Sequence, residues 1–227
     1  MKLCVALDLD SRQKSLELVR ELKEYPIWLK VGLRSFIRDG SGFLDELRAT
    51  NPQFKIFLDL KLHDIPNTMA DAAEAIADLG VDMLNIHASA GRRAMNEVVH
   101  RLKDHKNRPL ILAVTALTSF SDDEFRSIYD TSIITKASEF ARDAYSCGVD
   151  GVVCSAYESI EIKNATHRDF ITLSPGIRPF SEDSGDQRRV ADVAYAKSAQ
   201  VDFIVVGRPI YNNPDPKGVV EKILEQF

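Results

Sequence analysis

Short apolar runs alternate with amphipathic stretches along the whole chain, and this alternation limits the folds that the sequence can adopt. Several of the runs are apolar almost throughout and rich in β-branched residues, as expected of parallel strands that are covered on both faces. They span residues 3–7, 27–31, 55–60, 83–86, 110–114, 151–154, 170–173 and 203–206. The pattern predicts that these eight segments are β-strands.

The stretches between the runs have the spacing of helices that pack on a sheet. One helical face groups Met69, Ala72, Ala73 and Ile76, and a second groups Val219, Val220, Ile223, Leu224 and Phe227. Alternation sustained through eight units predicts an α/β fold, a closed TIM-type (β/α)8 barrel with an outer ring of helices. A doubly wound open sheet is the structural alternative. It is disfavoured because no glycine-rich dinucleotide fingerprint follows the first run.

Length and composition indicate a single domain that does not span a membrane. No linker, repeat or low-complexity segment divides the chain, so residues 1–227 are expected to form a single catalytic domain. The net charge of −5 argues against nucleic acid as a main partner. Charged residues come too early for a signal peptide, and no apolar stretch approaches the roughly 18 residues of a membrane span. We therefore expect a cytoplasmic protein that binds neither nucleic acid nor membrane.

The cysteine pattern gives no sign of a disulfide framework or a metal site. Cys4, Cys147 and Cys154 form an odd set without a C-x-x-C pair, which suits neither disulfides nor a thiolate zinc site. Cys4 and Cys154 lie inside apolar runs, so they are predicted to be buried, unreactive thiols.

Polar residues gather where the apolar runs end. They are Asp8, Lys30, Asp59 with Lys61, His87, Thr115, Pro175-Gly176 and Gly207-Arg208. Any one of them alone is most simply a turn or cap residue. Together, charges of both signs after several runs predict an active site at the carboxyl ends of the strands, where TIM barrels carry it.

The third run is followed by the most informative segment. Strand alternation places Asp59 and Lys61 on one face, and Asp64 stands just before Pro66, which suits the first turn of a helix. A purely structural alternative makes Asp64 an N-cap and Asp59–Lys61 an ion pair. A lysine held between carboxylates stays protonated. Lys61 is therefore predicted to donate a proton rather than to form a Schiff base.

The segment Asp59-x-Lys61-x-x-Asp64-Ile65-Pro66-Asn67-Thr68 resembles the signature of the orotidine 5'-phosphate decarboxylase family. The likeness extends from Asp8 to Arg208, nearly the whole chain. The D-x-K-x-x-D core alone also occurs in sugar-phosphate decarboxylases and aldolases of the same superfamily, and the Ile-Pro-Asn-Thr extension makes the match specific. The resemblance implies an enzyme of de novo pyrimidine biosynthesis that converts orotidine 5'-monophosphate into UMP without metal or cofactor.

The resemblance also implies roles for the charged residues. Asp8 and Lys30 would lie near the ribose, and Lys61, assisted by Asp59, would donate a proton to C6 of the pyrimidine. Asp64, a further member of the charged array, would come from the neighbouring subunit together with Thr68. These last two positions imply a homodimer with shared active sites.

The remaining predicted contacts lie on the pyrimidine edge and the phosphate. Thr118 matches the position that hydrogen-bonds the pyrimidine, with Ser119 as an alternative. Gly207 and Arg208 follow the eighth run, where barrels commonly bind phosphate against backbone N–H groups. The resemblance adds Arg178 and places Gln187 on the phosphate, in a polar segment suited to a closing loop. An ordinary surface loop is the alternative for that segment, and His87 is expected to be a supporting or structural residue.

The charged residues also discriminate against two rival functions. A magnesium-dependent decarboxylase or aldolase for sugar phosphates would need carboxylates around its metal, whereas Lys30 would repel Mg²⁺. A catalytically silent nucleotide-phosphate binding protein would keep Gly207 and Arg208. It would have no need for Asp59 and Lys61 together with Asp64.

Overall fold

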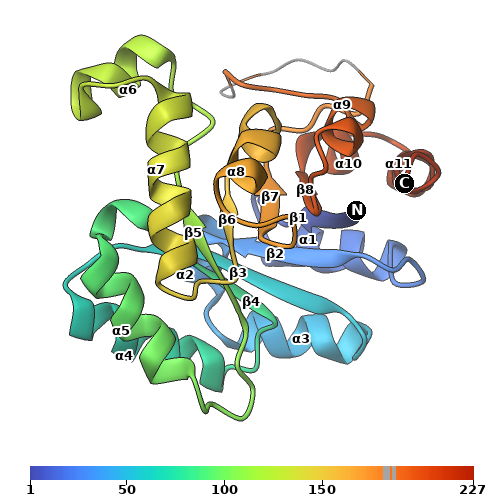
Figure 1. Ribbon diagram of the computed structural model, residues 1–227. Helices are drawn as coiled ribbons and strands as arrows, with labels where there is room; N and C mark the ends of the chain where they lie inside the picture. The colour runs from blue at the N-terminus through green and yellow to red at the C-terminus, as the bar shows by residue number, and fades with distance from the viewer. Residues whose placement is uncertain (181–184, 186–187) are drawn as a thin grey trace.

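Parallel strands close into a barrel in the computed structural model of this chain, which describes residues 1–180, 185 and 188–227 (Figure 1). Neighbouring strands follow the order of the sequence, and β1 pairs with β8 to close the ring. The strands are β1 (Lys2–Ala6), β2 (Trp28–Gly32), β3 (Lys55–Leu62), β4 (Met83–His87), β5 (Leu110–Val114), β6 (Gly151–Val153), β7 (Ile171–Ser174) and β8 (Phe203–Val206). The predicted TIM-type (β/α)8 barrel is confirmed, and the predicted strand ends lie within two residues of the observed ones.

Helices surround the barrel (Figure 1). Within the described residues they are α1 (Arg12–Glu21), α2 (Leu33–Asp39), α3 (Gly42–Thr50), α4 (Pro66–Asp78), α5 (Arg92–Leu102), α6 (Asp122–Tyr129), α7 (Ile133–Ser146), α8 (Ser159–Ala165), α9 (Val193–Ser198), α10 (Arg208–Tyr211) and α11 (Pro216–Leu224), with 3-10 turns η1 (Ala88–Ala90) and η2 (Ala156–Glu158). The predicted helical faces are buried at Met69, Ala73 and Ile76 of α4 and at Val220 and Ile223 of α11.

Two apolar layers form the core, because successive strand residues point to opposite faces of the sheet. On β1, Cys4 and Ala6 pack inside the barrel, while Leu3 and Val5 pack outward against the helices. The inner layer consists of Cys4, Ala6, Phe57, Met83, Leu112, Val114, Val153, Leu173, Phe203 and Val205. This filled interior is a packed core that supports a site only at the end of the barrel.

All three cysteines are free and buried. Burial raises the pKa of the Cys154 thiol to about 12 and also raises the pKa of Cys4 well above its usual value. Because the thiolate is the reactive form, the prediction that Cys4 and Cys154 are buried, unreactive thiols is confirmed.

Candidate active site

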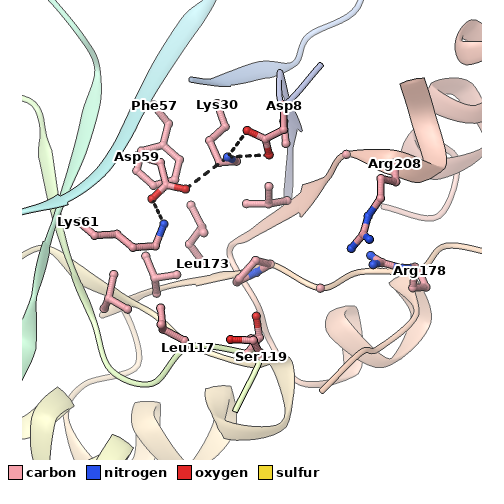
Figure 2. A pocket seen from close by; sticks show the side chains of 18 of the residues that line it. Asp8, Lys30, Phe57, Asp59, Lys61, Leu117, Ser119, Leu173, Arg178 and Arg208 are labelled. Carbon is pink, nitrogen blue, oxygen red and sulfur yellow. Dashed lines mark hydrogen bonds and ion pairs between the residues drawn. The ribbon is translucent and has the colours of Figure 1, made fainter. Parts of the chain in front are cut away.

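A cavity of about 270 Å³ opens at the carboxyl ends of the strands, as predicted. Its apolar lining continues the inner layer of the barrel core. Its polar lining is contributed by Asp8, Lys30, Asp59, Lys61, Thr118, Ser119, Arg178, Arg208 and Tyr211. Side chains from distant parts of the sequence therefore meet at one end of the barrel (Figure 2).

Four side chains of alternating charge form a row along one wall of this cavity (Figure 2). The ammonium of Lys30 lies 3.1 Å from Asp8 Oδ2 and 3.4 Å from Asp59 Oδ2, and Lys61 Nζ lies 2.6 Å from Asp59 Oδ1. Gly32 leaves room for the row, because a Cβ there would lie only 2.9 Å from Lys30 Nζ. The array therefore runs Asp8–Lys30–Asp59–Lys61, and we call it the charged row.

The central members of the charged row hold one another in the ionised state. Lys30 and Asp59 are each 8% exposed. Burial by itself would lower the pKa of Lys30, but the carboxylates of Asp59 and Asp8 outweigh it and raise that pKa. Burial would raise the pKa of Asp59, but the ammonium groups of Lys30 and Lys61 and hydrogen bonds from Lys61 and Asn85 lower it. Asp59 therefore faces Lys61 as a carboxylate at neutral pH.

Lys61 reaches Asp59 by a route that differs from regular strand alternation. The pairing of β3 with β4 shifts between Leu58 and Leu62, which marks a bulge. Within the bulge Lys61 has a left-handed backbone with φ of 52°. The predicted meeting of Asp59 and Lys61 is confirmed, but the assumption of an uninterrupted period of two was wrong because the strand is irregular there.

Asp64 and Thr68 are exposed and do not line the cavity of their own chain. Helix α4 begins at Pro66, its N-cap is Ile65, and Asp64 Oδ1 accepts a hydrogen bond of 2.7 Å from the Ile65 N–H. Asp64 therefore precedes the N-cap residue. The prediction that it lies in the first turn of the helix and the alternative that it is the N-cap are both wrong. Within this chain the charged row ends at Lys61.

Two arginines occupy the end of the cavity opposite Lys61 (Figure 2). Arg178 follows β7, and Arg208 begins the short helix α10 directly after Gly207. A Cβ on Gly207 would lie 3.3 Å from both Ala6 Cβ and Tyr211 Cε1, so glycine allows the backbone to pass close to these side chains. Paired guanidinium groups offer the fork geometry that suits a phosphate. The predicted contact Gln187 lies outside the described residues.

The loop after β5 brings both candidates for the pyrimidine contact to the cavity. Thr118 is buried and Ser119 is exposed, and each lines the wall. The carbonyl of Thr118 accepts hydrogen bonds from the N–H groups of Arg188 and Arg189 at 3.1 and 3.3 Å. Arg189 also bonds the Leu117 carbonyl at 3.1 Å and forms an ion pair with buried Glu158. This loop is therefore held from the β6 and β7 side of the barrel.

His87 stands outside the main cavity and lines a smaller one of about 170 Å³ beside it. Its ring stacks on His63 with centroids 5.2 Å apart. Burial, with smaller effects from His63 and Lys61, lowers the pKa of His87 to about 4. His87 is therefore neutral at pH 7. Its position agrees with a supporting or structural role.

This depressed pKa predicts a loss of stability in mild acid. The unfolded chain takes up a proton at His87 below about pH 6.5, whereas the folded chain resists until about pH 4, so stability falls as the pH drops through that window. We expect the free energy of unfolding to fall less in His87→Gln than in wild type over this pH window, by roughly 2–3 kcal/mol. Urea unfolding at several pH values measures this, with exposed His167→Gln as control. Parallel pH profiles for wild type and His87→Gln would contradict the assignment.

Sequence reasoning does not single out two polar residues of the site. Asn85 on β4 donates from Nδ2 to Asp59 Oδ1 at 2.7 Å and accepts at Oδ1 from the Lys61 N–H at 2.8 Å. Tyr211 lines the cavity one turn after Arg208, and burial raises its pKa. Asn85 left a signal, because it is a polar residue inside an otherwise apolar run. No feature of the sequence around Tyr211 distinguishes it from an ordinary helix residue.

The charged row leaves little place for a divalent cation. The Lys30 ammonium already bridges Asp8 and Asp59, which are the carboxylates that such an ion would use. Among the described residues, no three His, Cys, Asp or Glu side chains are grouped to hold a metal ion. In the same part of the chain, no helix has the length and apolar character needed to cross a membrane.

Fold and site together define a TIM-barrel protein with an Asp–Lys row along one wall of its cavity and two arginines at the end opposite Lys61. Residues 1–223 match the Orotidine 5'-phosphate decarboxylase / HUMPS family, and the chain belongs to this enzyme family.

Relatives and solved structures agree with that membership. The chain is 67% identical over its whole length to the complete orotidine 5'-phosphate decarboxylase of Sulfurimonas denitrificans. It is 64% identical to that of a Nitratiruptor species, covering 99% of both chains. The crystal structure of orotidine 5'-phosphate decarboxylase from Lactobacillus acidophilus superposes with a TM-score of 0.83 at 34% identity, covering 100% of this chain and 98% of the other.

Proposed function

We propose that this chain decarboxylates orotidine 5'-monophosphate to UMP, as a step of de novo pyrimidine biosynthesis and without metal or cofactor. The observation that carries the proposal is the charged row, which ends at Lys61 and faces two arginines across one cavity. Full-length relatives named for this activity support the choice of substrate.

The chemistry explains the need for a protonated lysine. Breaking the bond between C6 and the carboxylate leaves its electron pair on C6, with no adjacent carbonyl to delocalise it. The Lys61 ammonium stabilises this developing charge and then transfers a proton from Nζ to C6. Asp59 holds the Lys61 ammonium in place through their 2.6 Å contact, and solvent later restores the lost proton.

The other residues bind the two ends of the nucleotide. Arg178, Arg208 and the Gly207 turn, with Gln187, hold the phosphate, while Asp8 and Lys30 contact the ribose and Thr118 or Ser119 contacts the pyrimidine edge. Binding at the phosphate does no chemistry itself. It supplies free energy that orients the reacting ring against Lys61 and excludes water.

The proposal includes a homodimer in which Asp64 and Thr68 complete the neighbouring subunit's site. Both residues are exposed and lie away from their own cavity. Between them lies Ile65, whose large apolar side chain is 67% exposed. A subunit interface at the start of α4 would bury Ile65 and bring the Asp64 carboxylate to another chain.

Mixing inactive variants tests the shared site. After subunit exchange, Lys61→Ala and Asp64→Ala chains form hybrid dimers with one intact site, so an equal mixture should regain about a quarter of wild-type activity. The matched control mixes Lys61→Ala with Asp59→Ala. Asp59 and Lys61 of one chain line the same cavity, so each site of a hybrid dimer carries one of the two changes. This mixture should therefore regain no activity. Proven exchange without recovery in the first mixture would contradict a shared site.

We also propose that residues 1–227 act as one catalytic domain in the cytoplasm. The three free, buried cysteines support a reducing compartment.

Ultraviolet monitoring of orotidine 5'-monophosphate with the purified protein tests the activity. Rapid conversion to UMP that is unchanged by EDTA is expected. Conversion that stops in EDTA would indicate a metal-dependent enzyme. No conversion, followed by activity on sugar phosphates with Mg²⁺, would establish the rival reaction. Phosphate binding without any turnover would indicate a silent binding protein.

A further inference from the structure

Asn85 occupies the place where regular pairing between β3 and β4 fails. Leu58 pairs with Leu84 and Leu62 pairs with Ile86, so residues 59–61 of β3 face the single residue Asn85 of β4. A bulge of this kind leaves backbone groups without their ladder partners. The bulge also contains Lys61, whose φ of 52° is rarely adopted by a residue with a side chain.

The Asn85 side chain supplies the missing partners. Its Oδ1 accepts a hydrogen bond from the Lys61 N–H at 2.8 Å, and its Nδ2 donates to Asp59 Oδ1 at 2.7 Å. The same Asp59 oxygen accepts from Lys61 Nζ at 2.6 Å. One amide thus ties the backbone of Lys61 to the carboxylate that holds the ammonium of Lys61.

Burial isolates the Asn85 amide from solvent. Asn85 is 1% exposed, so both ends of its amide depend on these protein partners. Removing the amide would leave the partly buried Lys61 N–H without its acceptor and would take a donor from Asp59. Neither change touches Arg178 or Arg208 at the other end of the cavity.

We propose that Asn85 is a positioning residue, which fixes the left-handed backbone of Lys61 and the orientation of Asp59 so that the Lys61 ammonium points at the reacting carbon. The proposal rests on the proposed decarboxylase function for its kinetic consequence. Its structural part, the bond from the Lys61 N–H to Asn85, is independent of which reaction is catalysed.

The first test separates chemistry from binding. For Asn85→Ala we expect kcat to fall about 10²-fold, because small misplacements of catalytic groups cost that much. The KM and the Kd for UMP should stay within about threefold, because the phosphate contacts are intact. Asn85→Asp keeps the shape and the acceptor for the Lys61 N–H but sets a second carboxylate against Asp59. We expect it to lose at least as much kcat.

Thr172→Val is the matched control, because Thr172 is also a fully buried polar residue of a barrel strand, but its hydroxyl bonds Ser159 and Asp202 instead. It should lose stability without losing kcat. A kcat of Asn85→Ala within about threefold of wild type, or an equal kcat loss in Thr172→Val, would overturn the positioning role.

Hydrogen exchange at the Lys61 amide gives a second readout that needs no turnover. The Lys61 N–H should exchange much faster in Asn85→Ala than in wild type, and should stay protected in Thr172→Val. An unchanged rate in Asn85→Ala would overturn the proposal. If wild type failed to decarboxylate the nucleotide, the proposed function would fall, while the exchange experiment would still decide whether Asn85 holds Lys61.

Discussion

Replacing Lys61 by alanine is expected to lower kcat by about 10⁴-fold or more, because one change removes both the proton donor and the cation beside C6. Positioned proton transfer contributes roughly 10²–10⁴-fold, and a charge placed at the developing anion contributes roughly 10²–10³-fold more. Binding of UMP should remain measurable, because Arg178 and Arg208 lie at the opposite end of the cavity.

Single-turnover kinetics and calorimetric titration with UMP measure the two quantities separately. The matched control is Lys55→Ala at the far end of the same strand, where the lysine pairs with Asp82 at the surface. That variant should keep wild-type kcat. A near-normal kcat for Lys61→Ala would remove Lys61 from the chemistry, and loss of UMP binding in proportion to kcat would indicate a binding role instead.

For Arg208→Ala we expect kcat/KM for the nucleotide to fall between roughly 10²- and 10⁴-fold. The estimate follows from two charge-assisted hydrogen bonds of roughly 1.5–3 kcal/mol each, with about 1.4 kcal/mol for every factor of ten. The slow reaction of the phosphate-free nucleoside should change little, because that substrate has no group for Arg208 to bind.

Adding guanidinium ion should partly restore the activity of Arg208→Ala, because the small cation can occupy the space left by the side chain. Arg92→Ala serves as control, since Arg92 is an exposed residue of α5 that pairs with Asp143. Equal losses for the nucleotide and the nucleoside, or no loss at all, would exclude Arg208 as the phosphate ligand.

The barrel and the meeting of its charged residues follow from local sequence patterns. Buried parallel strands are apolar on both faces, so each strand leaves a distinct run, and its end is marked by the first polar residue. Because the carboxyl ends of parallel strands meet at one end of a barrel, the sequence predicts that Asp8, Lys30 and Asp59 lie close together. The structure brings these three within ion-pair distance.

Other features depend on contacts that no local pattern encodes. The bulge at Lys61 accompanies a shift in the pairing register between β3 and β4. Asn85, 24 residues further along the chain, accepts the hydrogen bond of the Lys61 N–H within this bulge. The ion pair of Arg189 with Glu158 likewise joins segments 31 residues apart. A motif can indicate that Lys61 is important, but it cannot show what holds Lys61 in place.

In the proposed reaction carbon dioxide leaves C6 and an exchangeable proton of Lys61 takes its place. The decisive experiment is to carry out the reaction in deuterium oxide with EDTA and to examine the product by NMR and mass spectrometry. Wild type should release one carbon dioxide for each UMP formed, and every UMP should carry deuterium at C6. Release of carbon dioxide without deuterium at C6, or no decarboxylation in EDTA, would contradict it.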